Sequence, residues 1–342
     1  MKRANHLIGQ VADPDNLRLA FWKARKGKSH AQGVEAYRVN LDNNLMRLRE
    51  QILTGLVEVG QYHYFKVYEP KERKICAAAF SEQVLHHALM NVCHPYFEHC
   101  QISDSYASRK GKGTYAALGK AQRFACNYSW YLKLDVRKFF ESIHRGVLRE
   151  QLIRLFKDPK LLEIFGKILD SYETGPDRGL PIGNLTSQYF ANHHLSGLDH
   201  FVKEVLRIEA YVRYMDDMVL WSDEKAVLKN AFAAITAFVE ERLLCTLKPE
   251  QLNKTAEGLP FLGYRVRPYH TRLLGQSKQR FVRKFRYAEN MLGSGEWGQA
   301  TYQRHVAPLV AFTQHADAGT FRACLMERTC NLKNETEKGL SP

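Results

Sequence analysis

The chain has no hydrophobic run that approaches the roughly 18 residues of a membrane-spanning helix. Its first ten residues, MKRANHLIGQ, also lack the apolar core of a secretory signal peptide. We therefore expect a cytoplasmic protein without a membrane partner. The hydrophobic fraction of 45% is ordinary for a globular protein, so general disorder is not expected in this chain of 342 residues.

None of the seven cysteines belongs to a CxxC pair, which argues against a disulfide framework. The segment CHPYFEHC, residues 93–100, holds two Cys and two His, but its spacing matches no common zinc site. It follows an amphipathic helical stretch that Pro95 is expected to end. Buried structural thiols are therefore favoured over a metal site there.

Acidic residues are too few to balance the basic ones: 36 Asp and Glu face 50 Lys and Arg, for a net charge of +14. An ordinary solvated surface would explain part of this excess. However, the basic residues recur in clusters, several of them alternating with aromatic residues: KARKGKSH (23–30), EPKERK (69–74), SRKGKG (108–113) and QSKQRFVRKFRY (276–287). This pattern favours a long nucleic-acid-binding surface.

The hydrophobic periodicity predicts mixed helices and strands. We expect two helices within 14–54, a strand pair within 62–80 that turns at Glu69-Pro70, and a helix from about Ser81 to Cys93. A strand at 130–136, a helix at 186–206, a hairpin at 209–222, a helix at 224–242 and a strand starting at 261–270 follow. The chain then reads as helical from Ser277 to about Cys330. This order predicts an α+β, ferredoxin-like sheet flanked by two further lobes around a groove.

Two adjacent aspartates, Asp216 and Asp217, interrupt the apolar stretch YVRYMDDMVLW (211–221). Asp135 ends another apolar strand, in LKLDVRKFF, and an antiparallel sheet would bring it to the same edge as Asp216. Burying a carboxylate is costly unless it is paired or binds a metal. Converging carboxylates suit two Mg²⁺ ions, or Mn²⁺, of the kind that catalyse in-line phosphoryl transfer. A lone Asp-Asp pair would equally suit a simple turn.

These motifs carry a family resemblance. YMDD at 214–217 and LKLDVRKFF resemble two catalytic motifs of reverse transcriptases. GLPIGNLTSQYFANHHL (179–195) is similar to their motif that supports template and incoming nucleotide, and LNKTAEGLPFLGYRV (252–266) to the next two motifs, the second being the primer grip. VYEPKERKICAAAF and SDSYASRKGKGTYAAL resemble fingers segments of bacterial enzymes. The resemblance covers residues from about 15 to 330.

The resemblance implies an α+β right-hand polymerase with a ferredoxin-like palm, fingers and a helical thumb. Residues 1–120 would form the N-terminal region and fingers, 121–270 the palm with some interleaved fingers elements, and 271–330 the thumb. Residues 331–342 form a polar tail that we expect to be disordered. The activity implied is RNA-directed DNA polymerisation from deoxynucleotide triphosphates, with template RNA and a primer or cDNA strand as partners.

The IGNLTSQ form of the middle motif, the short length and the KARKGK start resemble one bacterial branch, the reverse transcriptases of diversity-generating retroelements. That branch implies copying of a template-repeat RNA into cDNA with errors at adenines, together with a small basic accessory protein. A retron or phage-defence reverse transcriptase is the alternative. An inactive RNA-binding assembly module is a third reading, which the retained aspartates argue against.

The family pattern makes Asp135, Asp216 and Asp217 the catalytic metal ligands, with the backbone carbonyl of Val136 beside them. Phe140 matches the aromatic gate that rejects a ribose 2′-hydroxyl, although it could also be a core residue packed on Phe139.

The same pattern gives a set of nucleotide-binding residues: Arg73, Lys66, Lys74, Phe140, Ile182, Gly183, Gln188 and Lys254. Arg73 suits a triphosphate clamp because its planar guanidinium binds phosphate bidentately. Ile182 stands where many relatives carry Gln, so we hypothesise reduced fidelity; a loop residue that only packs is the alternative. Lys254 matches a general acid for pyrophosphate, or is a plain surface lysine.

Further residues are expected to contact nucleic acid through backbone approach, polar groups or phosphate pairing. They are Lys71, Arg109, Lys110, Lys112, Asn184, Ser187, Tyr214, Met215, Leu262, Gly263, Tyr264, Lys278, Arg283 and Lys284. Asn184 could alternatively cap the helix that follows it.

Overall fold

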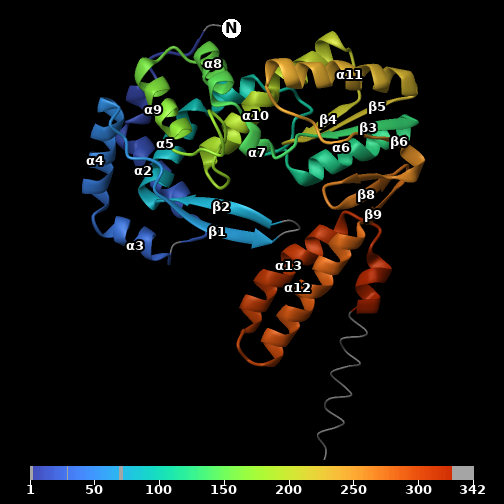
Figure 1. Ribbon diagram of the computed structural model, residues 1–342. Helices are drawn as coiled ribbons and strands as arrows, with labels where there is room; N and C mark the ends of the chain where they lie inside the picture. The colour runs from blue at the N-terminus through green and yellow to red at the C-terminus, as the bar shows by residue number, and fades with distance from the viewer. Residues whose placement is uncertain (1–2, 29, 69–71, 326–342) are drawn as a thin grey trace, which may run out of the picture. The chain divides into compact units, whose positions relative to one another are not determined.

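A computed structural model describes residues 3–28, 30–68 and 72–325 (Figure 1). The chain divides into two compact units. The first comprises Met1–Gly113, Leu132–Leu220 and Ala226–Gln251, and the second Thr114–Tyr131, Trp221–Lys225 and Leu252–Pro342. The predicted boundaries of fingers, palm and thumb remain predictions. The expected turn at Glu69-Pro70 and the tail 331–342 lie outside the described residues.

The first unit begins with α1 (Ile8–Val11), α2 (Pro14–Arg25), α3 (Gln32–Val39) and α4 (Leu41–Thr54). The Asp13 carboxylate caps α2 by accepting hydrogen bonds from two backbone N–H groups of its first turn. Residues 14–54 thus form three helices, whereas the periodicity predicted two. After α2 the chain turns at Gly27, whose φ of +78° ends the helical path, and α3 forms as a separate short helix.

The strands β1 (Tyr62–Tyr68) and β2 (Glu72–Ala78) form an antiparallel pair, and α5 (Phe80–His99) follows. The prediction that Pro95 ends this helix was wrong, because α5 continues to His99 with Pro95 inside it. A proline removes one helical hydrogen bond. The apolar burial of Cys93 and Phe97 on either side of it offsets that loss.

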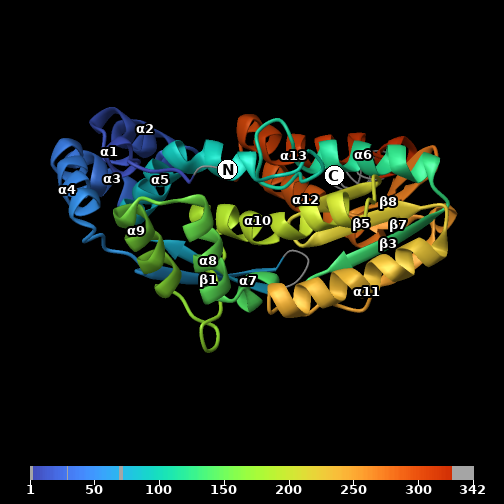
Figure 2. The same cartoon turned by 90° about the horizontal axis from the view of Figure 1, so that it is seen from above.

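A four-stranded sheet has the order β4-β5-β3-β6, built from β3 (Trp130–Asp135), β4 (Tyr211–Tyr214), β5 (Asp217–Ser222) and β6 (Gln251–Lys254). The chain order of these strands is that of a ferredoxin-like βαββαβ unit, and it agrees with the predicted α+β fold. Between β3 and β4 lie α7 (Phe139–Ser142), α8 (Arg145–Leu155), α9 (Pro159–Asp170), α10 (Leu185–His200) and the π-helical turn Phe201–Val205. Helix α11 (Lys225–Arg242) runs alongside the sheet (Figure 2).

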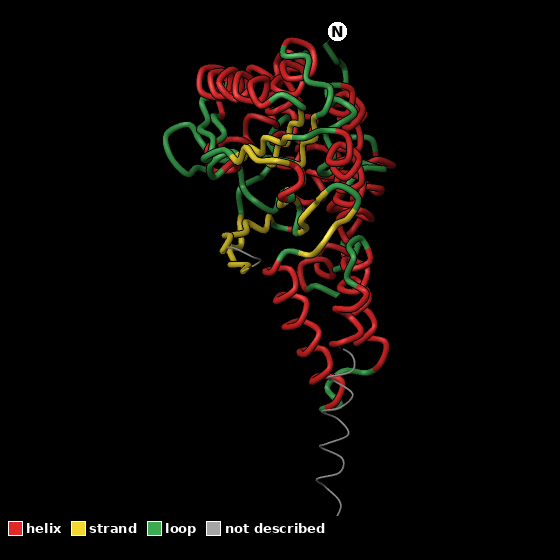
Figure 3. Tube along the Cα trace, turned by 90° about the vertical axis from the view of Figure 1, so that its right-hand side faces the viewer, coloured by secondary structure: helices red, strands yellow, loops and turns green. Residues whose placement is uncertain are grey.

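The second unit holds α6 (Thr114–Asn127), the 3-10 turn Thr255–Glu257 and a three-stranded sheet of β7 (Leu259–Phe261), β8 (Tyr264–Arg267) and β9 (His270–Leu273). It continues into α12 (Gly275–Gly293) and α13 (Gln299–Gln314), the paired helices of Figure 3. The long helical stretch predicted from Ser277 is therefore interrupted between α12 and α13. Phe281, Phe285, Ala288, Val306 and Leu325 form its buried cluster.

None of the described helices is long and apolar enough to cross a membrane.

Candidate active site

The β4–β5 hairpin determines where the two adjacent aspartates lie. Tyr214 pairs with Asp217, so Met215 and Asp216 form a two-residue turn. Met215 has a φ of +56°, which corresponds to the first central position of a primed hairpin turn and normally favours glycine. The turn therefore holds a non-glycine residue in a strained conformation directly before Asp216.

Strand β3 lies next to β5 in the sheet, and Asp135 ends it. Burial, together with the negative charges of Asp135 and Asp217, raises the pKa of Asp216 to about 6. Burial also raises the pKa of Asp217. The structure therefore brings the three carboxylates together at one edge of the sheet, where the charge of Asp135 disfavours the ionisation of Asp216 and Asp217.

Two lysines neutralise part of this charge. Lys248 Nζ lies 2.5 Å from Asp135 Oδ1, and Lys133 Nζ lies 3.1 Å from Asp217 Oδ1. Neither lysine was singled out in the sequence, and Lys248 lies in a loop, where a lysine carries no signal of its own. Lys133 could have been found as a charged residue within an apolar strand, by the argument applied to the aspartates.

Among the described residues, no group of three or more His, Cys, Asp or Glu side chains is arranged to hold a metal ion. In this arrangement the carboxylates of Asp135 and Asp217 are turned towards lysines. The donor set nevertheless fits a divalent cation, because three half-buried carboxylates supply hard oxygen ligands and a mutual repulsion that a cation would relieve. Val136, expected to add a backbone carbonyl, is fully buried and pairs with Leu247.

The two phenylalanines after β3 differ in exposure. Phe139 is buried in the core, whereas Phe140 is half-buried, with its ring 5.7 Å from that of Phe139. Phe140 thus packs edge-on against Phe139 while part of its surface stays exposed, and its role as the aromatic gate stays a prediction.

The 179–188 segment docks on strand β2. The Cys76 N–H donates to the Ile182 carbonyl at 2.7 Å, and a Cβ added to Gly183 would lie 2.7 Å from the Cys76 carbonyl oxygen. Gly183 therefore allows this segment to lie close against β2. The rest of the Gly183 surface is exposed. Ile182 is half-buried.

Two polar residues expected to contact nucleic acid point elsewhere. Asn184 is 3% exposed, does not cap α10 with its side chain and donates to the Tyr62 hydroxyl instead. Ser187 is 1% exposed. Asn184 directly precedes α10 and Ser187 lies in its first turn, and both side chains are buried, so nothing in this structure supports their predicted contact with nucleic acid. Gln188 is half-buried and accepts a hydrogen bond from Ser108.

The β1–β2 pair presents basic side chains to solvent. Lys66 and Lys74 face each other across the pair, and Arg73 lies opposite Val67. Lys66 forms an ion pair with Glu72, and Lys74 lies over the Tyr64 ring at 4.0 Å. Lys71 lies outside the described residues.

Arg109 makes its contacts inside the protein. Its side chain is 8% exposed, and its guanidinium pairs with Glu98 at 2.6 Å and donates to the carbonyls of Ile102 and Ser105. The sequence could not separate it from its neighbours, since SRKGKG is basic throughout. Lys112 donates to the Ser103 carbonyl, and Lys110 lines a cleft of about 420 Å³ together with Lys23.

The remaining candidates lie in the second unit. Leu262 and Gly263, with φ of +50° and +90°, form the tight β7–β8 turn expected at this position. Tyr264 was expected to contact nucleic acid, but it is fully buried and donates from its hydroxyl to the Phe312 carbonyl. Lys254 is exposed at the end of β6.

Helix α12 carries a basic face in the same unit. Lys278 and Arg283 are exposed and line a shallow cleft of about 610 Å³ together with Arg286 and Tyr287. Lys284 is half-buried and is not among the residues that line this cleft.

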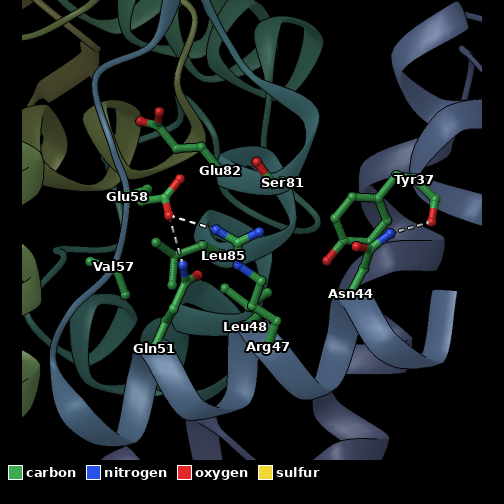
Figure 4. A pocket seen from close by; sticks show the side chains of 10 residues that line it. All are labelled: Tyr37, Asn44, Arg47, Leu48, Gln51, Val57, Glu58, Ser81, Glu82 and Leu85. Carbon is green, nitrogen blue, oxygen red and sulfur yellow. Dashed lines mark hydrogen bonds and ion pairs between the residues drawn. The ribbon is translucent and has the colours of Figure 1, made fainter. Parts of the chain in front are cut away.

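A separate cavity of about 150 Å³ lies between α4 and α5, where Arg47 and Gln51 point towards Glu58 (Figure 4). No residue predicted for the site lines it.

Comparison with known proteins gives one family match and several distant relatives. The profile of the family described as "Reverse transcriptase (RNA-dependent DNA polymerase)" matches residues 71–266, more than half of the chain. A COX1/OXI3 intron 1 protein of Saccharomyces cerevisiae is 18% identical over 60% of this chain and 26% of its own length. Nuclear intron maturase 2 of Arabidopsis thaliana is 23% identical over 37% of this chain and 19% of its own length. This chain thus spans about a quarter or less of these relatives.

Among solved structures, telomerase from Candida albicans in complex with the TWJ fragment of telomeric RNA aligns with a TM-score of 0.50. It is 10% identical, and the alignment covers 70% of this chain and 52% of that one. This likeness concerns the fold. The relatives matched are fungal and plant proteins, whereas the sequence motifs resemble bacterial enzymes.

Proposed function

The chain belongs to the reverse transcriptase family, and we propose that it copies an RNA template into DNA at the sheet edge where Asp135, Asp216 and Asp217 meet. The convergence of these carboxylates is the observation that carries the proposal. Three half-buried carboxylates, of which two lysines neutralise only part of the charge, cost stability unless a cation binds them.

The three aspartates would hold the divalent ions that this family uses. Those ions, when bound, activate the primer 3′-hydroxyl and stabilise the leaving pyrophosphate. The carboxylates contribute their full charge only when ionised, and ion binding favours that form of Asp216, whose pKa burial raises to about 6. Lys248 and Lys133 would have to release their carboxylates for this purpose.

The nucleotide would be selected and held by side chains from two neighbouring segments. The half-buried Phe140 ring would exclude a ribose 2′-hydroxyl. Arg73, Lys66 and Lys74 on the exposed β1–β2 pair would bind the triphosphate. Their positive charges suit this role, and the ion pair of Lys66 with Glu72 is a surface pair that is easily exchanged.

Template and primer would be bound mainly through phosphates. In the first unit, Lys110 and Gln188 would support the template, with Met215 and Tyr214 beside the primer end. In the second unit, the α12 face of Lys278 and Arg283 would follow the duplex backbone.

We further propose that the enzyme serves a diversity-generating retroelement, copying a template-repeat RNA with errors at adenines and working with a small basic accessory protein. The segment IGNLTSQ, residues 182–188, supports this narrower assignment. An aliphatic Ile182 removes a side chain that could hydrogen-bond to the incoming nucleotide. We expect Ile182→Gln to lower the misincorporation rate, and an unaltered rate would leave Ile182 as a packing residue.

Primer extension on a defined RNA template with Mg²⁺, followed by cDNA sequencing, tests both the polymerase activity and the assignment to a retroelement. The inactive control is Asp216→Ala. Product from the wild type but not from this variant supports the polymerase. Errors concentrated opposite template adenines support the retroelement, and accurate cDNA would favour a retron or phage-defence enzyme. Absence of product, with the accessory protein supplied, would contradict the proposal.

A further inference from the structure

Arg213 is the one large basic side chain with no exposed surface in the described part of the chain. It lies in β4, two residues before the turn of the hairpin. Its guanidinium forms a bidentate ion pair with the equally buried Asp199 of α10, with distances of 2.6 and 2.7 Å. Such a pair is expensive to desolvate, and replacing it with apolar residues often costs nothing in stability. Stability alone therefore does not explain its presence.

The remaining donors of Arg213 reach three different segments. Nη1 donates to Asn192 Oδ1 at 3.1 Å and to the Met215 carbonyl at 3.0 Å. Nη2 donates to Gln101 Oε1 at 3.2 Å. The backbone N–H of Arg213 also donates to the Asp104 carbonyl, and its carbonyl accepts from the Tyr106 N–H, both at 2.9 Å. A single planar group thus ties α10 and the 101–106 segment to the hairpin turn.

The hydrogen bond from Arg213 to the Met215 carbonyl acts on the backbone directly before Asp216. Met215 has a positive φ of +56°, a conformation that non-glycine residues avoid, and its carbonyl belongs to the peptide that leads directly into Asp216. A charged donor anchored by Asp199 holds this carbonyl, and with it the orientation of the next residue.

We propose that Arg213 is a positioning residue that locks the Met215 turn so that the Asp216 carboxylate faces Asp135 and Asp217. The inference rests on the proposed function, since it assigns a purpose to the arginine within the same reaction. Arginine is required because its fork spans Asp199 and the Met215 carbonyl at once. A lysine at this position keeps the charge but has one nitrogen, which cannot serve both.

The test compares Arg213→Lys with Tyr211→Phe. The Tyr211 hydroxyl donates to Asp199 at 2.8 Å, so its removal weakens the same buried network without touching the turn. We expect Arg213→Lys to lower kcat by about tenfold or more, the scale of one charge-assisted hydrogen bond. The Kd for primer–template should stay within about twofold, since the phosphate-binding lysines and arginines are unchanged. Tyr211→Phe should retain kcat.

Equilibrium binding of Mn²⁺ to the protein–primer–template complex, followed by the electron paramagnetic resonance signal of free Mn²⁺, gives a readout apart from activity. Arg213→Lys should weaken it, and Tyr211→Phe should not. If Arg213→Lys is too unstable to purify, Arg213→Lys in a Met215→Gly background is compared with Met215→Gly alone. Glycine accepts the positive φ, so the arginine should then matter less for kcat.

Equal loss of kcat in Arg213→Lys and Tyr211→Phe, or wild-type kcat and Mn²⁺ binding in Arg213→Lys, would overturn the inference and leave the polymerase proposal intact. A wild-type protein as inactive as Asp216→Ala would instead overturn the proposed function.

Discussion

Replacing Gly183 with alanine should lower the free energy of unfolding by about 2–4 kcal/mol, a large part of the stability of an ordinary domain. Two effects add. The φ of Gly183 is +127°, where a side chain brings backbone strain of about 1–3 kcal/mol. A Cβ would also stand 2.7 Å from the Cys76 carbonyl oxygen, inside van der Waals contact. Because that atom is strand backbone, the segment itself must move.

Movement of this segment would break the 2.7 Å hydrogen bond from the Cys76 N–H to the Ile182 carbonyl, which is worth about 1 kcal/mol. Since Ile182 is proposed to contact the incoming nucleotide, Gly183→Ala should also raise the KM for deoxynucleotides in primer extension.

Urea unfolding followed by circular dichroism measures the stability change, with Gly9→Ala as the matched control. Gly9 lies in the same unit without a positive φ and without any atom within 4 Å of its added Cβ. The control should change stability by less than about 1 kcal/mol. If the two variants unfold at the same urea concentration, the docking of this segment on β2 does not constrain it as argued.

Three further outcomes are expected. Phe140→Ala should admit ribonucleotides in primer extension, and unchanged sugar discrimination would reassign the ring to packing. Burial lowers the pKa of His193 to about 4, so its contribution to stability is full above the unfolded value of about 6.5 and should fall by roughly 2 kcal/mol by pH 5. In urea titrations, His193→Leu should remove that part of the pH dependence and leave the part from His87 and His194, whose pKa values burial also lowers. Arg109→Gln should destabilise the protein by about 1–3 kcal/mol while leaving the salt dependence of RNA binding unchanged. The hydrogen bond from Arg109 lowers the pKa of Glu98. The destabilisation caused by Arg109→Gln should therefore be full above the ordinary pKa of Glu and should shrink as the pH falls through the lowered pKa of Glu98.

Local patterns in the sequence determined the elements that carry the chemistry. Runs of apolar, β-branched and aromatic residues predicted β3 and the β4–β5 hairpin, and charges inside those runs identified Asp135, Asp216 and Asp217 as candidates. The same logic would have identified Arg213, since it too interrupts an apolar strand. The resemblance to the primer-grip motif also predicted a tight turn at Leu262-Gly263, and the positive φ values of these two residues suit the glycine there.

Only the tertiary structure decided which polar side chains face inward. Arg109, Asn184 and Ser187 lie in segments that read as nucleic-acid contacts, yet packing against Glu98 and the core turns them away from solvent. Pro95 continues a helix that local propensity would end, because burial on both sides outweighs one lost hydrogen bond. The lysines that neutralise Asp135 and Asp217 come from other parts of the chain. Burial and ion pairing depend on contacts between distant residues, and no local window of sequence contains them.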